Sequence, residues 1–312
     1  MTRTKKRTNV IKLVFGLALL LFIAWKITSS FKQTDLDALQ FSPTASWMFL
    51  IALVLMPVNW ILESLKWHLL VKDIEKTSFT NSIVSVLAGI STGLLTPNRI
   101  GNFIGRTMSM EKVNRTKGIL ATIHSNLAQF SASVLFGVMS LLFLGLDIEY
   151  LDRSSVNVSA ILMLIVALSL YYFPRLIDFN PISKLYSNQM QLALEHLQKE
   201  SFLLKTTVLF VSITRYLVFL AQFYLLLNCF PINVASDTLI LAIALVYLIT
   251  TIIPSFLFGK LFIREASALF VLEGFGIESS IILLTAFLLW FINLAIPSLV
   301  GAVILLKSEP KV

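Results

Sequence analysis

Long apolar runs are the sequence feature that most constrains how this chain can fold. Crossing about 30 Å of hydrocarbon takes about 20 apolar residues in a helix. Of the 312 residues, 57% are hydrophobic and 13% are charged, a balance that excludes a soluble domain of this size. The sequence therefore predicts an all-α polytopic membrane protein with a single membrane domain over residues 1–312. About six full transmembrane helices are expected at 10–28, 47–70, 118–146, 156–173, 205–230 and 279–306.

The lysine and arginine residues of the chain cluster at the ends of these apolar runs. The formal net charge is +8, but the basic residues form no stripe with interleaved aromatics, so we expect no nucleic-acid partner. Lysine and arginine are enriched in short cytoplasmic loops. This rule predicts cytoplasmic N- and C-termini, and it assigns Lys66, Lys72 and Lys76 to an inner loop.

A short pattern occurs once in each half of the chain, where an apolar segment is interrupted. The first copy, TPNRIGNFIGR, ends at Arg106, and the second, IPSFLFGKLFIR, ends at Arg264. In each copy the Arg follows a Gly by five residues. Paired hydrophobic segments broken by Gly and Pro are the best sequence indication of a binding site built from discontinuous helices. The predicted breaks are Pro97, Gly101, Pro254 and Gly259.

Loop charges predict how the two broken segments enter the membrane. Both ends of 81–110 lie next to basic residues, which indicates a re-entrant hairpin on the cytoplasmic side. The last span must begin outside, so the segment 239–274 forms a second re-entrant hairpin from the outer side. This inverted repeat would enclose a cavity between the hairpins. Leucines at helical spacing in 174–200 predict an amphipathic connector on the cytoplasmic interface.

Ionisable residues within the apolar segments are the candidates for a binding site, because they are costly in hydrocarbon. Basic groups outnumber acidic ones, which favours an anionic ligand, and arginine can hold phosphate through two parallel hydrogen bonds. The predicted lipid-headgroup site comprises Arg99, Arg106, Lys260, Arg264, Glu265, Arg215 and Glu63. One alternative stays open, in which Glu63 with Arg215, or Arg264 with Glu265, only locks the bundle together. His124 is expected to form hydrogen bonds in helix packing.

The sequence has no signature of the common catalytic sites. It lacks a Ser-His-Asp set, a His-Glu-x-x-His motif, Walker spacing and a paired-carboxylate pattern. Cys229 is the single cysteine, so an internal disulfide and a cysteine metal cluster are excluded. We therefore expect no catalytic residues, no metal and no cofactor.

The two motifs carry a resemblance to a known family. LLTPNRIGNFIGR is similar to the Pro-x-Arg-x-Gly-Glu stretch of the lysylphosphatidylglycerol synthase transmembrane-region family, with Asn102 in place of the acidic residue. PSFLFGKLFIREASALFVLEGFGI is similar to its Pro…Gly…Arg-Glu segment, with Lys260 and Phe262 in place of common glycines. The resemblance implies a flippase-like protein of a bacterial cytoplasmic membrane. It also implies that the aminoacyltransferase domain of the two-part synthases is missing, so we expect no aminoacyl-lipid synthesis.

These observations lead to one main functional hypothesis and two alternatives. The main hypothesis is a flippase-like transporter that binds an anionic phospholipid or polyprenyl-phosphate headgroup between the hairpins, with Arg106 and Arg264 as phosphate contacts. The first alternative is an intramembrane enzyme or accessory subunit acting on a lipid-linked substrate. It would need a general base, for which Glu63, Glu265 or His124 is available. The second is a structural partner of another membrane protein. A homodimer or a partner enzyme is compatible with each of them.

Overall fold

The structure is a computed structural model that describes residues 40–96, 99–144, 152–173, 199–253 and 259–307, with the single residues Val14, Leu21, Ala24, Trp25, Thr28 and Glu195. All elements in these ranges are helical, which confirms the all-α prediction there. Almost all of the first predicted span and of the connector 174–200 lies outside the described residues. So do Pro97 and Pro254, and for 259–261 the backbone alone is described.

Five helices in the described ranges are long and apolar enough to cross a membrane. Their bounds lie within a few residues of the predicted spans, so the chain is a multi-pass membrane protein. They are α2 (Ala45–Val71), α5 (Arg115–Leu144, after the 3-10 turn Lys112–Asn114), α6 (Arg153–Tyr172), α8 (Phe202–Leu227) and the continuous α11 (Ser279–Trp290), η6 (Phe291–Ala295) and α12 (Ile296–Lys307).

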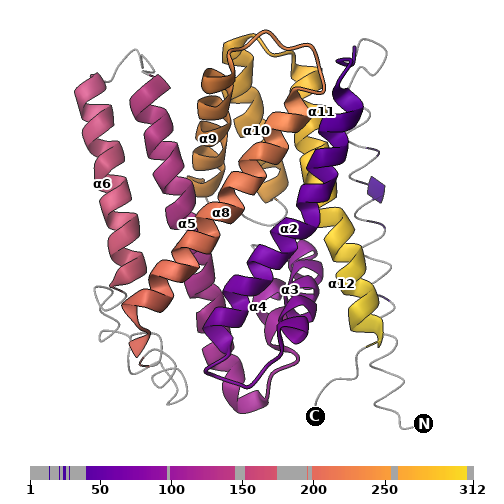
Figure 1. The fold of residues 1–312 in the computed structure, drawn as a ribbon, viewed down its shortest axis with the longest axis vertical. Coiled ribbons are helices and arrows are strands. Elements are labelled where there is room, and N and C mark those ends of the chain that lie inside the picture. Colours follow the sequence, from indigo (N-terminus) through magenta and orange to yellow (C-terminus); the bar gives the residue numbers. More distant parts are fainter. Residues whose placement is uncertain are drawn as a thin grey trace.

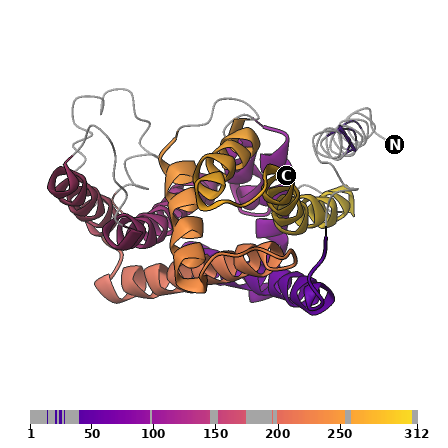
Figure 2. The same ribbon diagram turned by 90° about the horizontal axis from the view of Figure 1, so that it is seen from above.

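Four shorter helices form two pairs in different halves of the molecule. α3 (Phe79–Leu94) packs against α4 (Ile100–Thr107), and α9 (Ser236–Ile252) packs against α10 (Gly259–Leu272), which is followed by the 3-10 turn Glu273–Phe275. At about 1.5 Å per residue, none of the four reaches across about 30 Å of hydrocarbon. Figure 1 shows α3 and α4 in the lower half, and α9 and α10 in the upper half. Seen from above in Figure 2, α6 lies at one side of the molecule, beside α5.

The last span is divided where its sequence disfavours a regular helix. Phe291–Ala295 forms a π-helical turn that ends two residues before Pro297, which has no backbone N–H to donate. The two parts of the span have different neighbours, because α11 packs against α8 and α10 while α12 packs against α3. One span therefore contacts both short-helix pairs.

Glycines bring the backbones of α3 and α4 into contact. Gly89 and Gly93 in α3, and Gly101 and Gly105 in α4, each have the four-residue spacing that allows close helix packing in membranes. A Cβ at Gly101 would lie 2.6 Å from the carbonyl carbon of Thr92. The Thr92 hydroxyl also donates a 2.6 Å hydrogen bond to the Gly101 carbonyl. No larger residue fits at this contact without moving the helices apart.

The distribution of side chains is opposite to that of a soluble protein. Large apolar side chains such as Trp47, Leu203 and Phe270 are at least 70% exposed, whereas several charged side chains are buried, among them Glu63, Lys66 and Arg106. A hydrophobic core of α8, α9 and α11 contains the fully buried Phe223 and Trp290. This arrangement is expected where lipid tails surround the molecule.

A buried amide network joins three spans near the middle of the bundle. Asn59 in α2 donates to Gln222 in α8 at 2.7 Å and to Asn293 in η6 at 3.0 Å. Asn293 donates to Gln222 at 3.0 Å, and Gln222 donates to the carbonyl of Ala52 at 2.8 Å. The network fixes the π-helical turn of the last span against α2 and α8.

Candidate functional site

Glu63 in α2 is a buried carboxylate that is surrounded by three cations. Its Oε1 lies 2.5 Å from a terminal guanidinium nitrogen (Nη2) of Arg106 in α4. Its Oε2 lies 3.0 Å from Nζ of Lys66, one turn along α2, and 3.3 Å from Nε of Arg215 in α8. We call these four residues the Glu63 cluster. It connects the lower short-helix pair to two long spans.

The Glu63 cluster carries more positive than negative charge. Three cations and one carboxylate give a formal charge of +2. The exposed fractions of the side chains are 1% for Lys66, 4% for Arg106, 7% for Glu63 and 18% for Arg215. Buried charges are tolerated when they are paired and hydrogen-bonded, so an excess of two positive charges calls for an additional anion.

Arg106 is held by several contacts but keeps one free donor. Its Nε donates to Oδ1 of Asn102 at 3.0 Å, and its guanidinium lies 5.7 Å from the ring centroid of Trp67. Gly89 leaves room for the side chain, since a Cβ there would lie 2.6 Å from Cγ of Arg106. The second terminal nitrogen, Nη1, is buried without a hydrogen-bond partner. Such an orphaned donor is costly and marks a place where a ligand oxygen can bind.

Gln129 in α5 connects the other two cations. Its Oε1 accepts hydrogen bonds from Arg215 at 3.0 Å and from Lys66 at 3.4 Å. Its Nε2 donates to the carbonyl of Ser212 in α8 at 3.4 Å. The guanidinium of Arg215 also lies 4.7 Å from the ring centroid of Phe219. Gln129 therefore orients both cations toward Glu63.

The upper short-helix pair supplies Arg264, which is partly buried in α10. It donates to the carbonyl of Ala286 in α11 at 3.1 Å, and its Nε is buried without a hydrogen-bond partner. Its neighbour Glu265 is 7% exposed.

Arg99, at the start of α4, is near enough to both Arg106 and Arg264 for their charges to interact. Its charge interacts with those of Arg106, Arg215 and Arg264. It also has the left-handed backbone conformation, with φ 57° and ψ 29°, which is unusual for a residue other than glycine. A strained residue of this kind is often part of a functional site.

The structure thus brings together part of the predicted set. Glu63, Arg106 and Arg215 meet in one cluster, and the Glu63–Arg215 pair left open by the sequence is present. Lys260 lies on α10, but its side chain is not among those described. The assignment of Lys66 to a loop was wrong, because it lies in α2 and is 1% exposed. The sequence signal for Lys66 was its position three residues after Glu63, which places both on one face of the helix.

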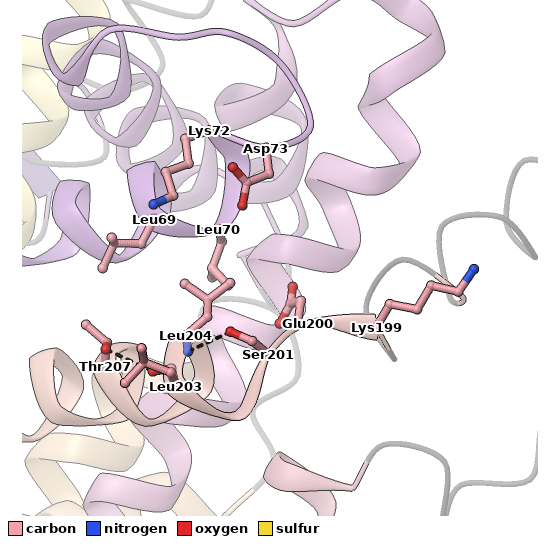
Figure 3. Close-up of a pocket in the computed structure, with 10 residues that line it drawn as sticks. All are labelled: Leu69, Leu70, Lys72, Asp73, Lys199, Glu200, Ser201, Leu203, Leu204 and Thr207. Carbon is pink, nitrogen blue, oxygen red and sulfur yellow. Dashed lines mark hydrogen bonds between the residues drawn. The ribbon is translucent and has the colours of Figure 1, made fainter.

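His124 belongs to a separate polar contact. Its Nδ1 lies 2.7 Å from Oε2 of Glu200, and both side chains are buried. Glu200 also lines a cavity of about 420 Å³ between the end of α2 and the start of α8. In Figure 3, Lys72 and Asp73 lie on one side of this cavity and Glu200 on the other. No member of the Glu63 cluster lines it.

Metal ligands are not grouped in the part of the chain that the structure describes. There, no three or more His, Cys, Asp or Glu side chains lie close enough together to hold a metal ion. The cations of the Glu63 cluster are donors for oxygen ligands, as in phosphate sites.

Comparison with known proteins identifies a family over nearly the whole chain. The sequence profile described as "Lysylphosphatidylglycerol synthase TM region" matches residues 9–301. Both Pro/Gly/Arg motifs and the whole Glu63 cluster lie within this match. No curated protein has significant sequence similarity to the chain.

Proposed function

The chain belongs to the lysylphosphatidylglycerol synthase TM region family, and we propose that it is a flippase-like transporter of lipids. The proposed substrate is a phospholipid or polyprenyl phosphate, whose anionic headgroup binds between the α3–α4 and α9–α10 pairs. In this proposal the two pairs are re-entrant hairpins from opposite faces of a bacterial cytoplasmic membrane, with both chain termini in the cytoplasm. The observation that supports it best is the positive excess of the Glu63 cluster.

The energetic argument starts from the cost of charge in a membrane. An uncompensated charge at the bilayer centre costs several kcal/mol, so charged residues there are usually functional. Arg106 and Arg264 end the two sequence motifs, and each has a buried nitrogen without a hydrogen-bond partner. Arg99 interacts electrostatically with both. A headgroup phosphate at this place would supply the missing negative charge and accept the free hydrogen bonds.

The contacts of two of the three candidate bases, Glu63 and His124, favour binding over catalysis. A general base needs an accessible lone pair within hydrogen-bond reach of its substrate. Both carboxylate oxygens of Glu63 contact cations, and His124 is paired with Glu200. These residues hold charge in place, and this role suits transport of an anionic headgroup.

The test is lipid translocation in liposomes containing the purified protein. Fluorescent phosphatidylglycerol and a fluorescent polyprenyl phosphate are added to one leaflet, and their appearance in the other leaflet is followed with a membrane-impermeant quencher. Arg106→Ala and Arg264→Ala should each lower the rate by about 30-fold or more, because breaking a buried charge contact costs about 2 kcal/mol or more.

Arg153→Ala is the matched control, because Arg153 is an exposed arginine at the start of α6. Size-exclusion chromatography and circular dichroism establish that each variant is folded. The proposal is refuted if wild-type protein moves neither lipid, or if folded Arg106→Ala and Arg264→Ala proteins match the Arg153→Ala control.

A further inference from the structure

We propose that the headgroup bound at the Glu63 cluster is a phosphomonoester dianion, preferred over a phosphodiester monoanion. This inference rests on the proposed function and specifies its substrate class. The preferred lipid would end in a phosphate with one ester bond, such as a polyprenyl phosphate or phosphatidic acid.

Charge balance is the first argument. Lys66, Arg106 and Arg215 share one carboxylate, so the cluster has an excess of two positive charges. A phosphomonoester carries close to two negative charges at neutral pH, because its second pKa is about 6. A phosphodiester carries one. In a buried site, the dianion neutralises the cluster, and the monoanion leaves one charge unpaired.

Hydrogen-bond capacity is the second argument. A phosphomonoester presents three terminal oxygens, which are strong acceptors. A phosphodiester presents two. Arg106 offers Nη1, which carries two N–H donors and is buried without a hydrogen-bond partner. The three N–H groups of Lys66 already have acceptors, at Glu63, Gln129 and the carbonyl of Ser125, so the open donors of the cluster are those of Arg106. The site is thus richer in donors than its own carboxylate requires.

Lys66 is the residue that raises the formal charge of the Glu63 cluster from +1 to +2. It lies on the same face of α2 as Glu63, and its ammonium is 3.0 Å from the carboxylate. Replacing it with methionine keeps an unbranched side chain of similar length but lowers the formal charge of the cluster to +1. The same cluster would then match a monoanion.

The experiment measures binding of defined lipids to the full-length protein in detergent micelles. The probes are dioleoyl phosphatidic acid and dioleoyl phosphatidylglycerol, which have the same acyl chains, and farnesyl phosphate. At pH 7, wild-type protein should bind phosphatidic acid at least about tenfold more tightly than phosphatidylglycerol, which corresponds to about 1.4 kcal/mol. At pH 5 the preference should fall below about threefold, because the phosphomonoester then carries a single charge.

Variants of Lys66 test the origin of the preference. Lys66→Met should abolish it while binding of phosphatidylglycerol persists, and Lys66→Arg should retain it. Lys72→Met removes a cation from an exposed position just beyond α2 and should leave the preference unchanged. Thermal unfolding of each variant establishes that it is folded, and Lys66→Arg keeps the test valid if Lys66→Met does not fold.

The results separate this inference from the proposed function. Equal affinity of wild-type protein for phosphatidic acid and phosphatidylglycerol at pH 7 overturns the dianion preference alone, provided that Arg106→Ala weakens both. Binding of none of the three probes overturns both proposals. If the preference for phosphatidic acid is found, its affinity is compared with that of farnesyl phosphate. Tighter binding of farnesyl phosphate assigns an isoprenoid lipid as the substrate, and tighter binding of phosphatidic acid assigns a glycerolipid.

Discussion

Substitution of Gly101 by alanine tests the close contact that positions Arg106. The added Cβ would lie 2.6 Å from the carbonyl carbon of Thr92, whereas ordinary contact begins at 3.4 Å. The carbonyl oxygen of Thr92 would lie closer still, so α4 must move away from α3 by at least roughly 0.8 Å. The neighbour is backbone, so no rotation of a side chain can relieve the clash. Overpacking of this kind costs about 1–3 kcal/mol, and the better helix propensity of alanine returns up to about 1 kcal/mol.

We therefore expect Gly101→Ala to destabilise the protein by about 2 kcal/mol. The displacement of α4 should also separate Arg106 from Glu63 and lower headgroup affinity by about tenfold. Equilibrium unfolding in mixed micelles with increasing sodium dodecyl sulfate measures the first effect, and lipid binding measures the second. Gly274→Ala is the control, because no atom lies within 4 Å of a Cβ at that position. If Gly101→Ala unfolds like Gly274→Ala, the close approach of α3 and α4 is wrong.

Three further predictions concern other parts of the fold. Gly301→Ala places a Cβ 2.7 Å from the carbonyl carbon of Leu87 and should destabilise the contact of α12 with α3 by about 1–3 kcal/mol, measured by the same unfolding assay. Gln222→Leu removes the central member of the amide network and should cost about 1–3 kcal/mol, whereas replacing all three amides by leucine should recover part of this loss. Burial raises the pKa of the Cys229 thiol, so the protonated form persists at neutral pH; N-ethylmaleimide should label Cys229 slowly in native protein and rapidly in sodium dodecyl sulfate. Rapid labelling of native protein would contradict its burial.

The long spans were predictable because each apolar run is bounded by charged or polar residues. The Gly and Pro pattern indicated short helices in the two broken segments, but Gly101 was wrong as a break, because it lies inside α4, and Gly259 is the first residue of α10. Single residues such as Glu63 and Arg215 could be identified as candidates because charge is expensive in a span. The sequence does not determine whether Glu63 and Arg215 touch, because they lie on different helices, α2 and α8, and their contact depends on how these helices pack.

The omission of Lys66 has a specific physical cause. The positive-inside rule treats a lysine near the end of an apolar run as a loop residue. It does not consider a carboxylate one turn earlier, which gives the lysine a partner inside the bundle. The π-helical turn at Phe291–Ala295 was missed for a related reason. Pro297 predicts an irregular helix at this place. The shape of the irregularity depends on the hydrogen bonds of Asn293 with Asn59 and Gln222, which form only in the folded structure.

The glycine contact between α3 and α4 also determines how the protein responds to temperature. Interfaces that exclude water weaken on cooling, because the hydrophobic effect is entropic near room temperature. Helices in a membrane associate by van der Waals contact and hydrogen bonds, without a gain from excluded water. Gly101 touches the backbone of Thr92 and accepts its hydroxyl hydrogen bond. The geometry that holds Arg106 against Glu63 is therefore not loosened by cold.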